Sequence, residues 1–307
     1  MSTKIKIIAF LLMAVMVITL TASCGNDTAE KPDTSKDREG NSITLPETIN
    51  KIVAMGPSNT EILVALGFGD KIIAADDYSS NITELKSDVM FFDMYEPDAE
   101  KILDLQPDVM FITGMTRSDG IDKYSILEDA GICIIFIPSS SSIDSIKEDI
   151  RFVAAVLGAD SKGSSIISDM EKEIDAIKKI GDTITADKKT VYFELSAAPY
   201  MYSLGTGTFI NEMIEMIGAV NCLADMGEWF AVADEAALEA NPDVILTSVN
   251  YIDAPVDEIK SRPGWDAITA VQNNNVYYID TDASNRPSHN VIKALKEMAK
   301  AIYPDKY

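Results

Sequence analysis

The order of the predicted elements indicates an α/β protein with two lobes. From residue 43 onward, short apolar runs typical of strands alternate with longer amphipathic segments typical of helices. Strands separated by helical segments favour mostly parallel, doubly wound sheets. One helical segment near the middle is much longer than the others, and similar residue spacings occur on both sides of it. We therefore expect two doubly wound α/β lobes joined by a single long, rigid helix.

The N-terminal lobe is predicted to span residues 43–159. Strands are expected at four short apolar runs, residues 51–55, 71–75, 109–113 and 133–137. Helices are expected at the amphipathic segments between and after them, residues 59–66, 99–105, 124–130 and 143–157.

The linker helix is predicted at residues 160–181. Apolar residues recur there at three- and four-residue intervals, with Asp160 placed to cap the start of the helix and Gly181 to end it. About 20 residues at 1.5 Å each give a length of about 30 Å, which matches the diameter of a small domain. An ordinary crossover helix is the alternative, but the length and central position favour a connection between lobes.

The C-terminal lobe is predicted to span residues 182–307. Strands are expected at residues 190–195, 244–248 and 276–280, and helices at residues 209–217, 235–239 and 290–302. Two spacings repeat those of the first lobe. Glu61 and Glu212 each stand five residues after a glycine, and Glu100 and Glu235 each stand seven residues before a Pro-Asp-Val sequence. The matching spacings predict two lobes of related plan.

The first residues indicate export. Lys4 and Lys6 precede an apolar run of 14 residues, 7–20, and small residues then lead to Cys24. A basic, an apolar and a small-residue region in this order are typical of a signal peptide, predicted here at residues 1–23. The run is shorter than the roughly 20 residues that a membrane-spanning helix needs. The polar residues 24–42 are predicted to form a flexible tether.

Composition excludes several classes of protein. The 307 residues include 26 Lys and Arg against 49 Asp and Glu, which gives a formal charge of −23. Such acidity disfavours nucleic acid as a partner, because phosphate backbones are bound mainly by Lys and Arg. One His and three Cys are too few for a His-rich metal centre, a zinc finger or an iron–sulfur cluster. We expect no cofactor, any metal to arrive already chelated, and Cys133 and Cys222 to be separate buried thiols.

Candidate ligand-binding residues follow the predicted strands. In open α/β sheets, ligands bind outside the carboxyl ends of the strands. Aromatic surface with a few polar groups suits a bulky organic ligand. The candidates are Ser58, Asn59, Tyr78, Tyr95, Met115, Arg117, Tyr202, Trp229, Tyr251, Arg286 and His289. No nucleotide-binding or nucleophile-elbow motif is present, so an enzyme would have to be a surface hydrolase or chelatase-like protein that uses His289.

Several motifs, taken together and in order, carry a family resemblance. They are KIVAMGPSNTE at residues 51–61, EKILDLQPDV at 100–109, ANPDVIL at 240–246, RPGW at 262–265 and AVQNNNVYYID at 270–280. The chain resembles the ABC-transporter solute-binding proteins for ferric siderophores, haem and cobalamin, over about residues 43–304. The resemblance implies the class III periplasmic-binding-protein fold, and the residues around Cys24 resemble a bacterial lipoprotein cleavage site with Cys24 lipidated.

The resemblance also implies partners. Glu100 and Glu235 match the carboxylates, one per lobe, that dock onto arginines of the membrane permease in this family. An acid in the first turn of a helix is also stabilising by itself, which is the alternative role for both. The expected protein is a monomeric, non-enzymatic receptor on the outer face of the bacterial membrane, serving a permease and its ATPase. The ligand is left open among hydroxamates, catecholates, haem and cobalamin, and a non-transport adhesin or sensor lipoprotein remains an alternative.

Overall fold

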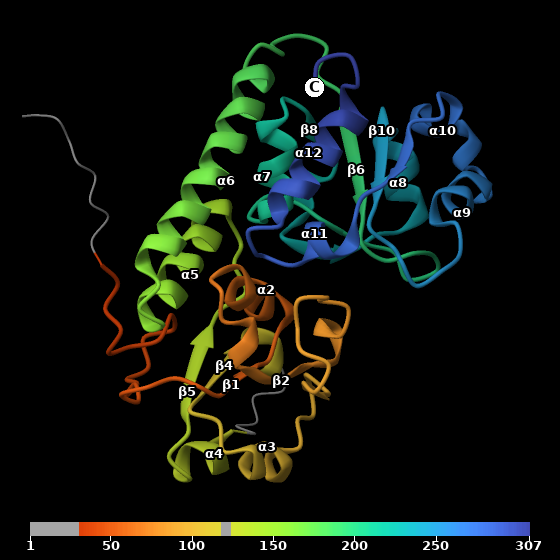
Figure 1. Ribbon diagram of the computed structural model, residues 1–307. Helices are drawn as coiled ribbons and strands as arrows, with labels where there is room; N and C mark the ends of the chain where they lie inside the picture. The colour runs from red at the N-terminus through yellow and green to blue at the C-terminus, as the bar shows by residue number, and fades with distance from the viewer. Residues whose placement is uncertain (1–30, 118–123) are drawn as a thin grey trace, which may run out of the picture. The chain divides into compact units, whose positions relative to one another are not determined.

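The computed structural model describes residues 31–117 and 124–307 and is drawn in Figure 1. Residues Asp33–Tyr307 form one compact unit. The predicted signal peptide, Cys24 and the first part of the predicted tether lie outside the described residues. Within the ranges that are described, no helix is both long and apolar enough to cross a membrane.

A five-stranded sheet forms the centre of the N-terminal lobe. Its order is β3-β2-β1-β4-β5, and every neighbouring pair is parallel. The strands are β1 (Ile52–Ala54), β2 (Ile72–Asp76), β3 (Met90–Phe92), β4 (Val109–Thr113) and β5 (Cys133–Ile137). The helices are α2 (Pro57–Ala65), α3 (Ala99–Leu105), α4 (Ser125–Asp129) and α5 (Ile143–Val156). Alternate residues of β1 and β4 face opposite sides, so one face packs on α2 and α5 and the other on α3 and α4.

The long helix α6 (Asp160–Gly181) packs on both lobes, against α5 in the first and against α7 and α12 in the second. Figure 1 shows it in green beside both. The helix has the predicted bounds and ends at Gly181, but its start differs in one detail. Ala159 is the N-cap residue, and Asp160 instead begins the helix. Gly181 is needed for close packing, because a Cβ there would lie 2.2 Å from the carbonyl oxygen of Met216 in α7.

The C-terminal lobe contains a four-stranded parallel sheet in the order β11-β10-β6-β8 and a separate antiparallel ribbon of β7 and β9. Its strands are β6 (Thr190–Glu194), β7 (Tyr202–Leu204), β8 (Val220–Asn221), β9 (Trp229–Ala231), β10 (Val244–Thr247) and β11 (Val276–Tyr278). Its helices are α7 (Phe209–Met216), α8 (Asp234–Ala240), α9 (Pro255–Ser261), α10 (Thr269–Gln272), α11 (Thr281–Asn285) and α12 (Val291–Ile302). Cys133 and Cys222 are free, and burial raises the pKa of the Cys222 thiol to about 12.

The two lobes share one strand order, which explains the repeated spacings. The strands β2-β1-β4-β5 of the first sheet correspond to β8-β6-β10-β11 of the second. In each lobe the Asp of the Pro-Asp-Val sequence joins equivalent strands: Asp108 Oδ2 accepts hydrogen bonds from the backbone of Asn50 and Lys51 at 2.7 and 2.9 Å. Asp243 Oδ2 accepts from the backbone and hydroxyl of Thr190 at 2.8 and 2.9 Å. The predicted fold class, two parallel α/β lobes with a long helix between them, is confirmed.

The prediction of a flexible tether is wrong for residues 33–42. Arg38 forms ion pairs with Asp149 and Glu148 of α5 at 2.7 and 2.9 Å. The buried carboxylate of Asp37 accepts hydrogen bonds from the backbone of Asn41 and, across to β5, from that of Phe136. Polar composition suggested a coil, but these long-range contacts fix the segment to the first lobe.

Candidate ligand-binding site

The candidate site is formed by the loops at the carboxyl ends of the strands, called here the carboxyl edges of the two sheets. In the first lobe, Ser58 follows β1, Tyr78 follows β2, Tyr95 follows β3 and Met115 follows β4. In the second lobe, Tyr251 follows β10, and the β7–β9 ribbon after β6 carries Tyr202 and Trp229. Parallel sheets place these loops on one edge of each lobe, as the sequence predicts.

Large apolar side chains are exposed at both carboxyl edges. The exposed fractions lie between 37% and 63% for Tyr78, Tyr95, Met115, Tyr202, Trp229 and Tyr251. Single exposed apolar residues are ordinary, but a group of them with polar neighbours is typical of a binding surface. We call these six residues the edge group.

Several members of the edge group are held by their neighbours. Partial burial raises the pKa of Tyr95, and the nearby phenol of Tyr78 and carboxylate of Asp93 raise it further. In the second lobe, the ribbon register puts Tyr202 and Trp229 on one face as diagonal neighbours. The Tyr251 hydroxyl lies 3.1 Å from Ser196 Oγ and accepts a hydrogen bond of 2.8 Å from the backbone N–H of Ala197. Each lobe therefore presents its rings on a supported loop.

Beneath this edge of the first lobe, buried polar groups join the loops. Asn59 is 1% exposed and donates to the carbonyl oxygens of Met55 and Ile112, so the structure places this candidate in the core. Asp76, which the sequence reading missed, accepts from the Gly56 N–H at 2.9 Å and from Ser79 Oγ at 2.7 Å. Burial raises the pKa of Asp76 against these hydrogen bonds. Its place at the end of an apolar strand was the available signal.

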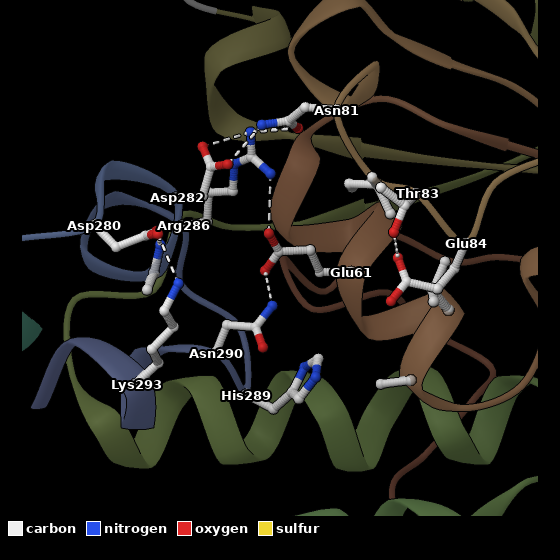
Figure 2. A pocket seen from close by; sticks show the side chains of 14 residues that line it. Glu61, Asn81, Thr83, Glu84, Asp280, Asp282, Arg286, His289, Asn290 and Lys293 are labelled. Atoms are coloured by element: carbon white, nitrogen blue, oxygen red, sulfur yellow. Dashed lines mark hydrogen bonds and ion pairs between the residues drawn. The ribbon is translucent and has the colours of Figure 1, made fainter. Parts of the chain in front are cut away.

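Arg286 and His289 lie in a cavity of about 510 Å³ lined by both lobes (Figure 2). Arg286 is fully engaged there. Its guanidinium contacts Glu61 at 3.0 Å and Asp282 at 2.8 Å, and it donates to the Tyr78 carbonyl oxygen and Asn81 at 2.8 and 3.1 Å. The structure therefore gives Arg286 contacts between the lobes.

His289 lines the same cavity with a largely buried ring. Burial lowers the pKa of His289, which keeps the imidazole neutral near pH 7. Among the described residues, no side chain or backbone group hydrogen-bonds to Nδ1 of His289. A hydrolytic triad needs a carboxylate at that nitrogen to orient the ring. This geometry gives no support to the alternative of a His289-dependent hydrolase.

The RPGW motif forms a second buried cluster, behind the carboxyl end of β6. The Arg262 guanidinium binds the carboxylate of Glu194, which is fully buried, at 2.6 and 3.0 Å. It also binds the partly exposed carboxylate of Glu258 at 2.5 and 3.0 Å. It also lies 4.4 Å from the centre of the Trp265 ring. Trp265 Nε1 in turn donates to Asp234 in the first turn of α8, at 3.1 Å. The motif thus links β6, α9 and α8.

Glu100 and Glu235 occupy equivalent places. Each is exposed in the first turn of a seven-residue helix, α3 or α8, and neither has an ion-pair partner within the described ranges. Each helix ends at a left-handed residue, Gln106 or Asn241. Both helices pack on the sheet face opposite to that of α6. The side chain of Arg117 and the whole of Cys24 lie outside the described residues.

Comparison with known proteins identifies the family. A family model described as periplasmic binding protein matches residues 52–283. An uncharacterized ABC transporter substrate-binding lipoprotein, YvrC of Bacillus subtilis, is 32% identical over 97% of this chain and 96% of its own. A cobalamin-binding protein of Halobacterium salinarum is 22% identical over 96% of this chain and 84% of its own.

Among solved structures, molybdate-bound MolA of Haemophilus influenzae superposes with a TM-score of 0.75 at 23% identity, covering 88% of this chain and 91% of MolA. That likeness supports the fold alone. These relatives are named as binding proteins and not as enzymes. The chain belongs to the periplasmic binding protein family and is an ABC transporter substrate-binding protein.

Proposed function

We propose that this protein is a lipid-anchored receptor outside the cytoplasm that captures a bulky metal chelate between its lobes and delivers it to an ABC permease. The chelate class is a ferric siderophore, haem or a corrinoid. The exposed edge group on both lobes is the observation that carries this proposal. The protein would act as a monomer, and it would need no cofactor of its own.

Aromatic side chains favour a large organic ligand over a small anion. Rings bind flat or apolar surfaces, whereas a small oxyanion is held by a compact set of polar donors. Of the two candidate arginines, only Arg286 has a described side chain, and it is engaged by Glu61 and Asp282. The cobalamin-binding relative from Halobacterium salinarum lends support to a corrinoid.

A thermal-shift panel tests the ligand class. Ferric hydroxamates, ferric catecholates, haemin and cobalamin are compared, with molybdate as the small-anion control. A ligand at 100 times its Kd adds about 2.7 kcal/mol to the free energy of unfolding, which raises Tm measurably. A shift with molybdate alone, or with none of the chelates, would refute the proposed class.

Variants then locate the site. For a ligand that binds, Trp229→Ala should weaken affinity about tenfold, as is usual for a central aromatic contact. The matched control is Ile126→Ala, which removes a similarly exposed apolar side chain from α4, on a helix that packs against a sheet face. Equal affinity in both variants would place the ligand away from the β7–β9 ribbon.

Docking to the permease is assigned to Glu100 and Glu235. Carboxylate–arginine pairs are geometrically specific and sensitive to salt, which suits reversible docking. The double variant Glu100→Ala, Glu235→Ala should abolish uptake in cells and leave the affinity of the purified protein unchanged. Asp104→Ala with Glu239→Ala is the control, because it removes two exposed acids one turn further along the same helices. Loss of affinity in the first pair would assign these acids to ligand binding.

A further inference from the structure

Glu61 and Glu212 are equivalent residues that each contact the opposite lobe. Glu61 lies in α2, which follows β1. Glu212 lies in α7, which follows the equivalent strand β6 and the ribbon strand β7. Their shared spacing from a preceding glycine is therefore a structural equivalence. The proposed function gives neither residue a role.

The Glu61 contact is buried and has three side-chain donors, two of which, Arg286 and Asn290, are drawn in Figure 2. Glu61 is 6% exposed and accepts from Arg286 Nη1 at 3.0 Å, from Ser288 Oγ and from Asn290 Nδ2 at 2.9 Å. All three donors lie in the C-terminal lobe, in the short segment between α11 and α12. Three of the roughly four acceptor sites of this carboxylate are therefore filled from across the lobe boundary.

The Glu212 contact runs in the other direction. Its Oε2 accepts a hydrogen bond of 2.8 Å from the backbone N–H of Ile143, the first residue of α5 in the N-terminal lobe. The first N–H groups of a helix have no partner within the helix, and the helix dipole favours a carboxylate there. The contact lies in a cavity of about 630 Å³ lined by α5, α6 and α7.

We propose that Glu61 and Glu212 form a reciprocal pair of inter-lobe contacts that, with α6, fix the separation of the lobes in the ligand-free protein. The inference rests on the proposed function in one respect. The separation of the lobes sets the width of the space between the carboxyl edges, where the ligand is proposed to bind. The two contacts differ in strength. The Glu61 contact is buried and charge-paired, whereas the half-buried Glu212 makes one hydrogen bond to a backbone N–H. The lobes therefore pivot at Glu61, and the Glu212 contact is the one that opens.

Distance measurement between the lobes tests this. Spin labels are attached through a ketone-bearing amino acid at the exposed positions Asp104 of α3 and Glu239 of α8, which leaves the native cysteines unchanged. The distance distribution is recorded by pulsed electron resonance without ligand. We expect one narrow distance in the parent and a second population in Glu212→Ala, with the ratio of the two states shifted about tenfold, equivalent to 1.4 kcal/mol.

Conservative variants separate positioning from general stability. Glu212→Gln keeps an oxygen that can accept from Ile143 N–H, so it should retain the narrow distribution. Asp175→Ala removes an exposed acid from the same cavity and should also match the parent. Glu61→Gln should broaden the distribution further, with Glu84→Gln in the cavity of Figure 2 as its control.

Several results decide the matter. A folded Glu212→Ala variant with the parental distribution would overturn the proposal and leave α6 as the connection that sets the separation. If Glu61→Gln does not fold, Ser288→Ala and Asn290→Ala remove its partners singly, and unchanged distances in both would also overturn it. Because no ligand is present, these outcomes are independent of whether the ligand class in the thermal-shift panel is right.

Discussion

Replacing Arg262 by Met should destabilise the protein more than any exposed charge change. Arg262 is 5% exposed, and it neutralises Glu194, whose side chain is 0% exposed. Met preserves much of the side chain's apolar length and removes the charge. The variant therefore leaves a carboxylate in the interior without a cation.

The expected loss follows from three contacts. Breaking a buried ion pair by removing one partner costs about 3–5 kcal/mol, because the remaining charge is uncompensated. The stacking on Trp265 adds about 0.5–2 kcal/mol. Glu258 is 32% exposed, so its pair with Arg262 adds little. We expect a total of about 4–6 kcal/mol at pH 7, as an upper range because Glu194 can take up a proton instead.

Urea unfolding followed by circular dichroism measures this loss. Lys260→Met, in the last turn of α9 and two residues before Arg262, is the control. Lys260 has no ion-pair partner among the described residues, so this change should alter stability by less than about 0.5 kcal/mol. Adding Glu194→Gln to Arg262→Met should recover most of the loss by removing the unpaired charge. A loss below about 1 kcal/mol, or no recovery in the double variant, would refute the reasoning.

Two further predictions concern pH and helix packing. Burial lowers the pKa of His289 below its unfolded value of 6.5, so the unfolded chain binds this proton more readily and stability should fall as pH decreases through that value. Thermal melts at pH 7.5 and 5.5 should show a smaller fall in His289→Gln, and equal falls would contradict the assignment. Gly181→Ala should lower the free energy of unfolding by about 1–3 kcal/mol, because its Cβ would lie 2.2 Å from the α7 backbone. The control Ser164→Ala, on the exposed face of α6, should have almost no effect. Equal melting temperatures for the two variants would show that α6 and α7 can separate freely.

The sequence could predict the fold because hydrophobic periodicity is a local signal. Apolar strands and amphipathic helices of more than about five residues were recognisable in both lobes. Most of the elements that were missed are shorter, such as β7 and β9 with three residues each, although the seven-residue helix α9 was also missed. The pairing of β7 with β9 joins residues at least 25 positions apart, which no local pattern reveals. Residues 33–42 were misassigned for the same reason, since Arg38 and Asp149 are 111 residues apart.

The candidate site was predictable only where position along a strand was sufficient. Tyr78 and Tyr251 follow strands, Tyr202 lies in the β7–β9 ribbon, and the structure exposes all three. Arg286 was selected by the same rule, but its partner Glu61 lies 225 residues away. The repeated spacing of Glu61 and Glu212 was visible in the sequence, whereas their inter-lobe contacts depend on the folded arrangement.

The pairing of the arginines has a consequence for ligand charge. Of the arginines near the carboxyl edges whose side chains are described, Arg262 is paired with Glu194 and Arg286 with Glu61. The described surface of the proposed binding site is consequently aromatic, on a chain with a formal charge of −23. Repulsion from such a field weakens with salt over a Debye length of about 8 Å. A neutral hydroxamate or a corrinoid should therefore bind more tightly than a highly anionic catecholate complex, and the difference should narrow as ionic strength increases.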